Sequence, residues 1–321
     1  MIFTNKNNLP YYLHKILTHE YYGGANVIQD FSTTQFGNSP TMTILQHRHK
    51  DEITSDSSDA LMRVLGSGVH AVCEMALAGE PSMKMEERLF VNIQGKVVGG
   101  QYDLYLTDSH TLIDFKLTKA NSYIFGGREE KYSSQMNINK YILEKNGYTV
   151  EKLDIVEIYR DWDEKKAKID SKYPPRAIII TTIPMVTSAV TEYRMKEYID
   201  EYEKLSSIPD TQLPPCSAKD RWESKGSFAV MQKGRKNAVK LCSTREEANA
   251  FINTGGVSIS TAYIEERIAT PVRCIDWCDV NKWCPFYNHY LAKIQSKKGS
   301  ELNEKTTTSD TKSSRDFNDF I

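Results

Sequence analysis

Three short apolar runs separated by turn residues lie near the middle of the chain. They are RLFVNI (88–93), VVGGQYDLYL (97–106) and LIDFKLT (112–118). Runs of this length bounded by turn signals are typical of β-strands. Gln94-Gly95-Lys96 after the first run and TDSH (107–110) after the second favour tight turns. We therefore expect an α/β fold whose mixed central sheet, flanked by helices, has these three antiparallel strands at its heart.

Longer segments follow the spacing of helices. Over 57–78, apolar residues recur every three or four positions and form one stripe, the kind that a helix turns towards a core: Leu61, Leu65, Val69, Val72 and Ala76. Gly66 and Gly68 weaken this helix and favour close packing against a neighbour. We expect further helices over 129–145 and 191–205, and further strands over 154–162 and 176–185.

The pattern changes after residue 212. From Leu213 the chain reads as strand, glycine turn, strand and helix, followed by the cysteine-rich segment RCIDWCDVNKWCPFY. From about residue 296 it is polar and is expected to be disordered. The predicted organisation is an N-terminal helical and loop segment packed on the core (1–56), the core (57–212), a small α+β insertion with the cysteine cluster (213–295), and a tail (296–321).

Composition narrows the class of protein. The 321 residues are 40% hydrophobic and 26% charged, as in a soluble globular protein, and the formal net charge of −1 gives no global attraction to nucleic acid. The N-terminus has no long apolar run, so we expect neither a signal peptide nor a membrane span. Six cysteines in a chain of this size favour a cytoplasmic protein with a metal-binding subset over a disulfide scaffold.

Asp114 and Lys116 lie two residues apart in the predicted strand 112–118, so their side chains share a face. An ion pair at a sheet edge, worth about 0–1 kcal/mol, is one explanation. However, pairing the strands about residues 108–109 sets Asp103 opposite Asp114, with their Cβ atoms about 5 Å apart. Two such carboxylates repel unless a cation lies between them, and Mg²⁺ takes oxygen ligands of this kind. Lys116 is then placed to orient or activate a metal-bound water.

Two helices add polar groups to this strand. His70 follows Gly66 and Gly68 on the first helix; a single helical histidine is more often structural, but a close backbone approach here makes it a further candidate metal ligand. Around the helix 129–145, four polar residues at helical spacing share one face: Arg128, Tyr132, Gln135 and Asn139. That face is either solvated or in contact with a phosphate backbone.

The order of these motifs resembles the RecB-like branch of the PD-(D/E)xK nucleases, including its phage-type and CRISPR-adaptation exonucleases. The resemblance covers about 60–145 and runs through GSGVH, GGQYD, DFK and YSSQ. It implies that His70, Asp103 and Asp114 hold Mg²⁺ or Mn²⁺ with the backbone carbonyl of Leu117. It also implies that Lys116 positions the attacking water and that Gln135 contacts DNA. The family motif has a tyrosine at the position that Asn139 occupies here. Tyr132 or Tyr141 can take the place of that tyrosine.

The cysteines fit the same branch. Cys274, Cys278 and Cys284 are closely spaced, and a proline follows the last of them. Three such thiols are well placed to ligate one metal centre, and Cys216 is the expected fourth ligand. Relatives that carry an iron–sulfur cluster also combine three C-terminal cysteines with a distant one, which favours [4Fe–4S] here. Zn²⁺ on four thiolates is the alternative. Cys73 and Cys242 are expected to be buried thiols.

Two further segments are candidate contact surfaces. The turn containing Lys233, Arg235 and Lys236 is either a solvated hairpin or a basic guide for a DNA strand. The chain ends on RDFNDFI, which is either a terminus without a role or an acidic, aromatic ligand for a replication or recombination protein.

Together these features predict a metal-dependent deoxyribonuclease, most simply an exonuclease of recombination, replication or repair. It would work in the cytoplasm, or in the host cytoplasm if phage-encoded. Its partner is DNA, as ends or single strands, and no membrane is expected. The alternatives are a non-catalytic DNA-binding or assembly module on the same fold, and the nuclease subunit of a helicase–nuclease complex. The chain itself contains no G-x-x-x-x-G-K-[ST] motif.

Overall fold

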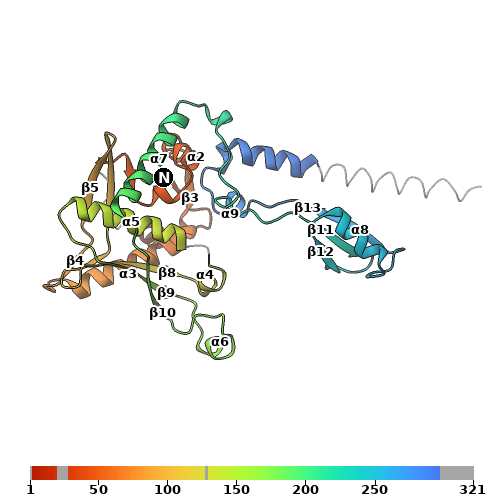
Figure 1. The fold of residues 1–321 in the computed structure, drawn as a ribbon, viewed down its shortest axis with the longest axis horizontal. Coiled ribbons are helices and arrows are strands. Elements are labelled where there is room, and N and C mark those ends of the chain that lie inside the picture. The colour runs from red at the N-terminus through yellow and green to blue at the C-terminus, as the bar shows by residue number, and fades with distance from the viewer. Residues whose placement is uncertain (1, 20–27, 127–128, 297–321) are drawn as a thin grey trace, which may run out of the picture. The chain divides into compact units, whose positions relative to one another are not determined.

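A computed structural model describes residues 2–19, 28–126 and 129–296 (Figure 1). The chain divides into a first unit, Met1–Ile208, and a second unit, Pro209–Ile321. Arg128 and the C-terminal tail, both singled out in the sequence, lie outside the described residues.

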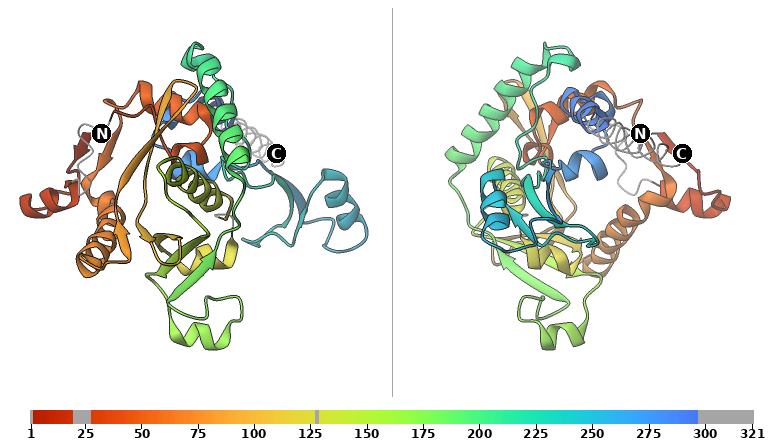
Figure 2. Two further views of the ribbon diagram at one scale, coloured as in Figure 1. Left: turned by 60° about the vertical axis from the view of Figure 1, so that its left-hand side comes forward. Right: turned by 90° about the vertical axis from the view of Figure 1, so that its right-hand side faces the viewer.

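The main sheet of the first unit is mixed, as expected, and has the strand order β10-β9-β8-β7-β4. Its strands are β4 (Met83–Met85), β7 (Leu104–Leu106), β8 (Thr111–Thr118), β9 (Lys152–Tyr159) and β10 (Ile178–Thr182). Only β8 and β9 are parallel; the other neighbours run antiparallel. The helix α6 (Glu164–Ile169) lies in the β9–β10 connection and projects from one end of this sheet (Figure 2).

The expected run of three antiparallel strands in one sheet is wrong. The segment 97–106 breaks at Tyr102-Asp103, because β6 (Lys96–Gln101) pairs with β5 (Arg88–Ile93) and β2 (Phe31–Ser32) in a second sheet, whereas β7 joins β8. Tyr102 is buried at the break, where its hydroxyl donates to Glu87. The tertiary partners of each half therefore override the local strand pattern, and Asp103 stands at the junction of the two sheets.

The helix α5 (Glu129–Lys145) contributes buried residues to two hydrophobic clusters of this unit. Met136 and Leu143 pack with Leu153 of the main sheet and with Tyr102 at the break between β6 and β7. Ile138 and Ile142 pack in a cluster with β6 and with α7 (Ser188–Ser206). The helix approaches β6 closely: a Cβ at Gly100 would lie 2.6 Å from Asn139 Oδ1. Gly100 is thus the residue that permits this contact.

The remaining elements of the first unit lie mostly near its N-terminus. The parallel strands β1 (Ile2–Thr4) and β3 (Thr54–Asp56) pair with each other, and α2 (Pro40–Arg48) packs against α7. The short helix α1 (Tyr11–Thr18) contacts the turn before α3, and α4 (Ala120–Phe125) follows β8.

The helix over 57–78 is confirmed as α3 (Leu61–Leu77), preceded by a 3₁₀ turn at Ser57–Ala60. Its apolar stripe, however, is not covered by the described part of the chain: Leu61, Leu65 and Val72 are 47%, 43% and 60% exposed. The stretch Ser57–Leu77 is also the one candidate, among the described residues, that has the length and composition of a membrane-crossing helix.

The second unit contains a three-stranded sheet of order β12-β11-β13, formed by β11 (Ser227–Gln232), β12 (Lys240–Cys242) and β13 (Ala262–Arg267). The helix α8 (Arg245–Asn253) contributes Ala248 to a small core with Val230 and Cys242. The helix α9 (Val272–Asp276) and a helix over 285–296 follow. Strand, turn, strand and helix were expected here; β13, which completes the sheet, was not.

Candidate active site

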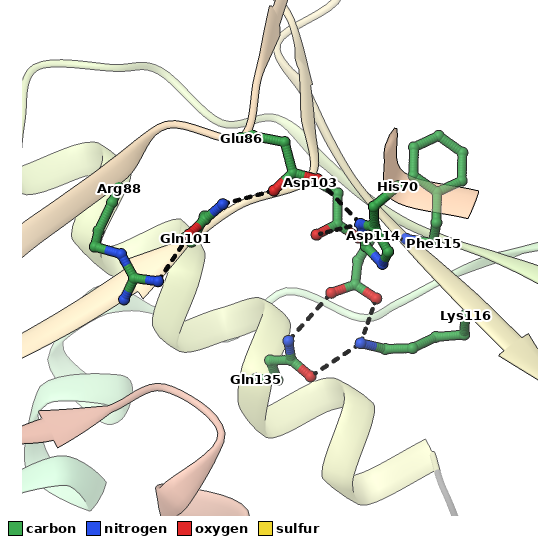
Figure 3. Close-up of polar contacts among 9 residues, drawn as sticks. All are labelled: His70, Glu86, Arg88, Gln101, Asp103, Asp114, Phe115, Lys116 and Gln135. Atoms are coloured by element: carbon green, nitrogen blue, oxygen red, sulfur yellow. Dashed lines mark hydrogen bonds and ion pairs between the residues drawn. The ribbon is translucent and has the colours of Figure 1, made fainter. Parts of the chain in front are cut away.

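A histidine and two carboxylates meet beside the break between β6 and β7 (Figure 3). His70 Nδ1 lies 3.0 Å from Glu86 Oε1 and 3.5 Å from Asp103 Oδ1. One potential ligand atom from each of the three residues lies within 4.8 Å of the others, a spacing that suits a single divalent ion. The structure therefore brings together two residues that were singled out in the sequence, His70 and Asp103.

Glu86 was not predicted from the sequence. It follows β4, whose last residue Met85 pairs with Leu104, and its N–H donates to the Asp103 carbonyl at 3.2 Å. Gln101 donates to Glu86 Oε2, and Arg88 in turn donates to Gln101, both at 2.7 Å. The only local signal was an acid pair, Glu86-Glu87, after a very short strand. The positive φ of 52° at Glu86 and the pairing of β4 with β7 are not visible in that pattern.

The second carboxylate of the prediction, Asp114, lies next to Asp103. The β7–β8 register pairs Leu104 with Ile113, and its continuation sets Asp103 beside Asp114, as the hairpin prediction required. Asp103 Oδ2 accepts the Phe115 N–H at 2.7 Å, which fixes its carboxylate. Burial, and then the negative charge of Asp114, raise the pKa of Asp103 to about 7.

Lys116 and Gln135 both contact the carboxylate of Asp114. Lys116 Nζ is 2.6 Å from Asp114 Oδ2, and Gln135 Nε2 donates to Asp114 Oδ1 at 3.1 Å. Lys116 also donates to Gln135 Oε1 at 3.3 Å, so the three side chains form a closed triangle (Figure 3). Burial opposes the charge on Lys116, but the attraction of Asp114 outweighs it and raises the lysine pKa. Lys116 is thus a fixed cation beside the carboxylates.

The neighbouring charges also shift the pKa of the His70 imidazole. Burial opposes its protonation, yet the hydrogen bond with Glu86 and the charges of Asp103 and Glu86 raise its pKa overall. A proton on Nδ1 thus lies between the ring and two carboxylates, the place that a cation would take. The donor set of one imidazole and the carboxylates of Glu86 and Asp103 fits a hard divalent ion such as Mg²⁺ or Mn²⁺.

Only part of the predicted polar face of α5 borders the candidate site. Tyr132 and Gln135 reach Lys116, whose Nζ lies 5.8 Å from the Tyr132 ring centroid. Asn139 is instead buried against Gly100, so it cannot meet a substrate. Leu117 lies in β8 directly after Lys116.

The four cysteines predicted to hold a second centre all lie in the second unit. Cys274 and Cys284 are buried, and Cys216 and Cys278 are half-buried. Burial, and then mutual repulsion among these thiolates, raise the pKa of Cys274 to about 12. Among the described residues, no three of these sulfurs lie within 4.8 Å of one another. A zinc ion with Zn–S distances of about 2.3 Å needs tighter spacing than this.

The two other cysteines differ in burial. Cys242 is a buried thiol, as expected, whereas Cys73 on α3 is only half-buried. The basic residues Lys233, Arg235 and Lys236 lie, as predicted, in the connection between β11 and β12, where all three are exposed.

No protein family model matches this chain, and no curated protein matches it. Among solved structures, the chain is similar to the protein titled SSO0001, with 17% identity and a TM-score of 0.43 over 59% of this chain and 84% of that one. It is also similar to a phage-related exonuclease from Haemophilus somnus 129PT, with 13% identity and a TM-score of 0.28 over 50% of this chain and 70% of that one.

Proposed function

We propose that this protein is a metal-dependent deoxyribonuclease of the RecB-like PD-(D/E)xK type. The observation that carries the proposal is the pair of buried carboxylates, Asp103 and Asp114, 8% and 4% exposed, facing each other between His70 and Lys116. A binding module has no use for two acids whose repulsion raises the pKa of one of them. A hydrolase that needs a divalent ion and an activated water uses every member of the set.

Each residue then has a defined role. His70, Glu86, Asp103 and Asp114 would hold Mg²⁺ or Mn²⁺, with the Leu117 carbonyl as a further oxygen donor. The ion supplies Lewis acidity to the phosphate and lowers the pKa of water. Lys116, held by Asp114 and Gln135, orients the attacking water and offsets the charge that develops on the phosphate. Gln135, fixed by the same two partners, and Tyr132 contact the substrate strand.

The test is cleavage of end-labelled single- and double-stranded DNA with Mn²⁺ or Mg²⁺. Asp114→Asn and Lys116→Ala are each expected to lower the rate at least about 100-fold, the scale of a lost acid–base or electrostatic group. The same sheet offers a matched control, because Lys152 and Asp154 form a similar pair two residues apart on β9, at 2.7 Å. Lys152→Ala should cleave at the parental rate. Parental cleavage by Asp114→Asn would refute the site, and a parent that binds DNA without cutting it would favour a non-catalytic module.

We also propose a pathway for the enzyme and a metal centre on its four C-terminal cysteines. We infer an exonuclease of recombination, replication or repair that acts in the cytoplasm, alone or as a subunit of a helicase–nuclease complex. Cys216, Cys274, Cys278 and Cys284 would hold a [4Fe–4S] cluster, and zinc is the alternative. Lys233, Arg235 and Lys236 would guide a DNA strand, and the tail would bind a replication or recombination protein.

A further inference from the structure

A cavity of about 220 Å³ lies along the main sheet of the first unit, beside the candidate active site. Ile155 and Glu157 of β9, Thr181 of β10 and the following Ile183 line it, together with Tyr132 and Glu129 of α5 and with Ser122 and Tyr123 of α4. The parallel register pairs Lys116 with Glu157 and Asp114 with Ile155, so these side chains share one face of the sheet. Asp114 and Lys116 on β8 are thus direct neighbours of the two β9 residues that line the cavity, Ile155 and Glu157.

Tyr132 links the cavity to the site. Its ring lies 5.8 Å from Lys116 Nζ and also lines the cavity. If the scissile phosphate lies at Lys116, the cavity is where the adjoining nucleotide would place its base. The volume is below the roughly 300–1,000 Å³ of pockets for drug-sized ligands, which suits one planar ring system.

The lining selects an uncharged aromatic group with hydrogen-bond donors. Glu129 and Glu157 put two carboxylates on the cavity, so a phosphate would be repelled. Tyr132 and Tyr123 also line the cavity, and bases stack on aromatic rings of this kind. The Tyr159 hydroxyl donates to Glu157 Oε2 at 3.0 Å and so fixes the carboxylate, which retains further lone pairs for a ligand.

We propose that this cavity binds the nucleobase next to the scissile phosphate and that Glu157 selects among bases by accepting their N–H groups; this inference rests on the proposed nuclease function. Guanine presents two neighbouring donors to a carboxylate and is the preferred occupant. Adenine and cytosine each present one amino group. Thymine flanks its single N–H with two carbonyl oxygens, which repel the carboxylate, so it is the poorest occupant.

The experiment compares the oligonucleotides d(TTGTT) and d(TTTTT), by cleavage in Mn²⁺ and by fluorescence anisotropy binding. A good carboxylate–base pair discriminates by about 1–3 kcal/mol, or roughly 5- to 150-fold, and the parent should show a guanine preference of this size in both assays. Glu157→Gln should bring the ratio to within about twofold of one while still cleaving the thymine substrate. The control is Glu197→Gln on α7, which removes another carboxylate that accepts from a tyrosine hydroxyl and should leave the ratio unchanged.

The outcomes separate the two proposals. A parent without base preference, or a Glu157→Gln variant that keeps the full preference, overturns the base pocket even if DNA is cleaved. A parent that cleaves nothing, but binds d(TTGTT) more tightly in a manner that Glu157→Gln abolishes, overturns the nuclease and supports the pocket.

Discussion

At the scale of single residues, Asp103 couples the protonation state of the site to stability. Its pKa of about 7 in the folded protein is above its ordinary value of 3.8. Between these two values the folded chain binds more protons than the unfolded one. Stability is therefore lost as pH rises from about 4 through 7, because Asp103 then ionises beside Asp114. A bound divalent ion would offset this repulsion.

We therefore predict that Mn²⁺ raises the melting temperature of the protein more at pH 8 than at pH 6. At pH 6 the ion has to displace protons from Asp103 and from His70, whose pKa is also raised. Thermal melts in Mn²⁺ and in EDTA at the two pH values measure the difference. An equal shift at both values, or none, would contradict the assignment of these residues as metal ligands.

The same melts test Glu86, a proposed ligand that the sequence pattern did not indicate. Glu86→Gln should weaken metal binding by roughly 10- to 100-fold, an effect seen even for groups that only orient ligands, and should shrink the Mn²⁺ shift. Its neighbour is a matched control, because Glu87 accepts hydrogen bonds from Tyr102 and Tyr148 and does not belong to the cluster. Glu87→Gln should lower the melting temperature itself but retain the full Mn²⁺ shift.

At the scale of elements, local patterns predicted α5 and the β5–β6 hairpin well. Their signals are local: helical spacing ended by Asn146-Gly147, and a Gln94-Gly95 turn in which both residues have positive φ. The split of 97–106 could not be predicted in this way, since it depends on which strand each half pairs with. The same reason explains β13, whose polar sequence acquires strand geometry by pairing with β11.

Helix α3 shows the limit of periodicity as evidence for burial. Its stripe predicted the helix correctly, but Val72 is 60% exposed, while Leu112 in β8 is 1% exposed. Val72→Ser should therefore change the free energy of unfolding by no more than about 0.5 kcal/mol. Leu112→Ala should lower it by about 2–5 kcal/mol, because it leaves a cavity in the main core. Urea unfolding of both variants measures this, and a loss above about 2 kcal/mol for Val72→Ser would mean that the stripe is covered.

At the scale of the whole molecule, the two units differ in how much core they contain. The first has two clusters of large buried residues around α5, whereas the second has a small cluster around Val230, Cys242 and Ala248. Small units with thin cores commonly depend on a metal centre for stability. A cluster on Cys216, Cys274, Cys278 and Cys284 would join residues that are far apart in the sequence of the second unit, and would supply that stability.

We therefore predict that protein purified without oxygen is brown and contains iron and sulfide. Cys284→Ser should lose the colour and lower the melting temperature of the second unit, because an open ligand position releases the cluster. Cys73→Ser is the control: Cys73 lies on α3 in the first unit, and its loss should leave both colour and melting unchanged.

Colour that survives Cys216→Ser would exclude that residue as the fourth ligand. A colourless protein with one zinc per chain would assign the site to zinc, and the sulfurs would then have to move closer together than they lie here.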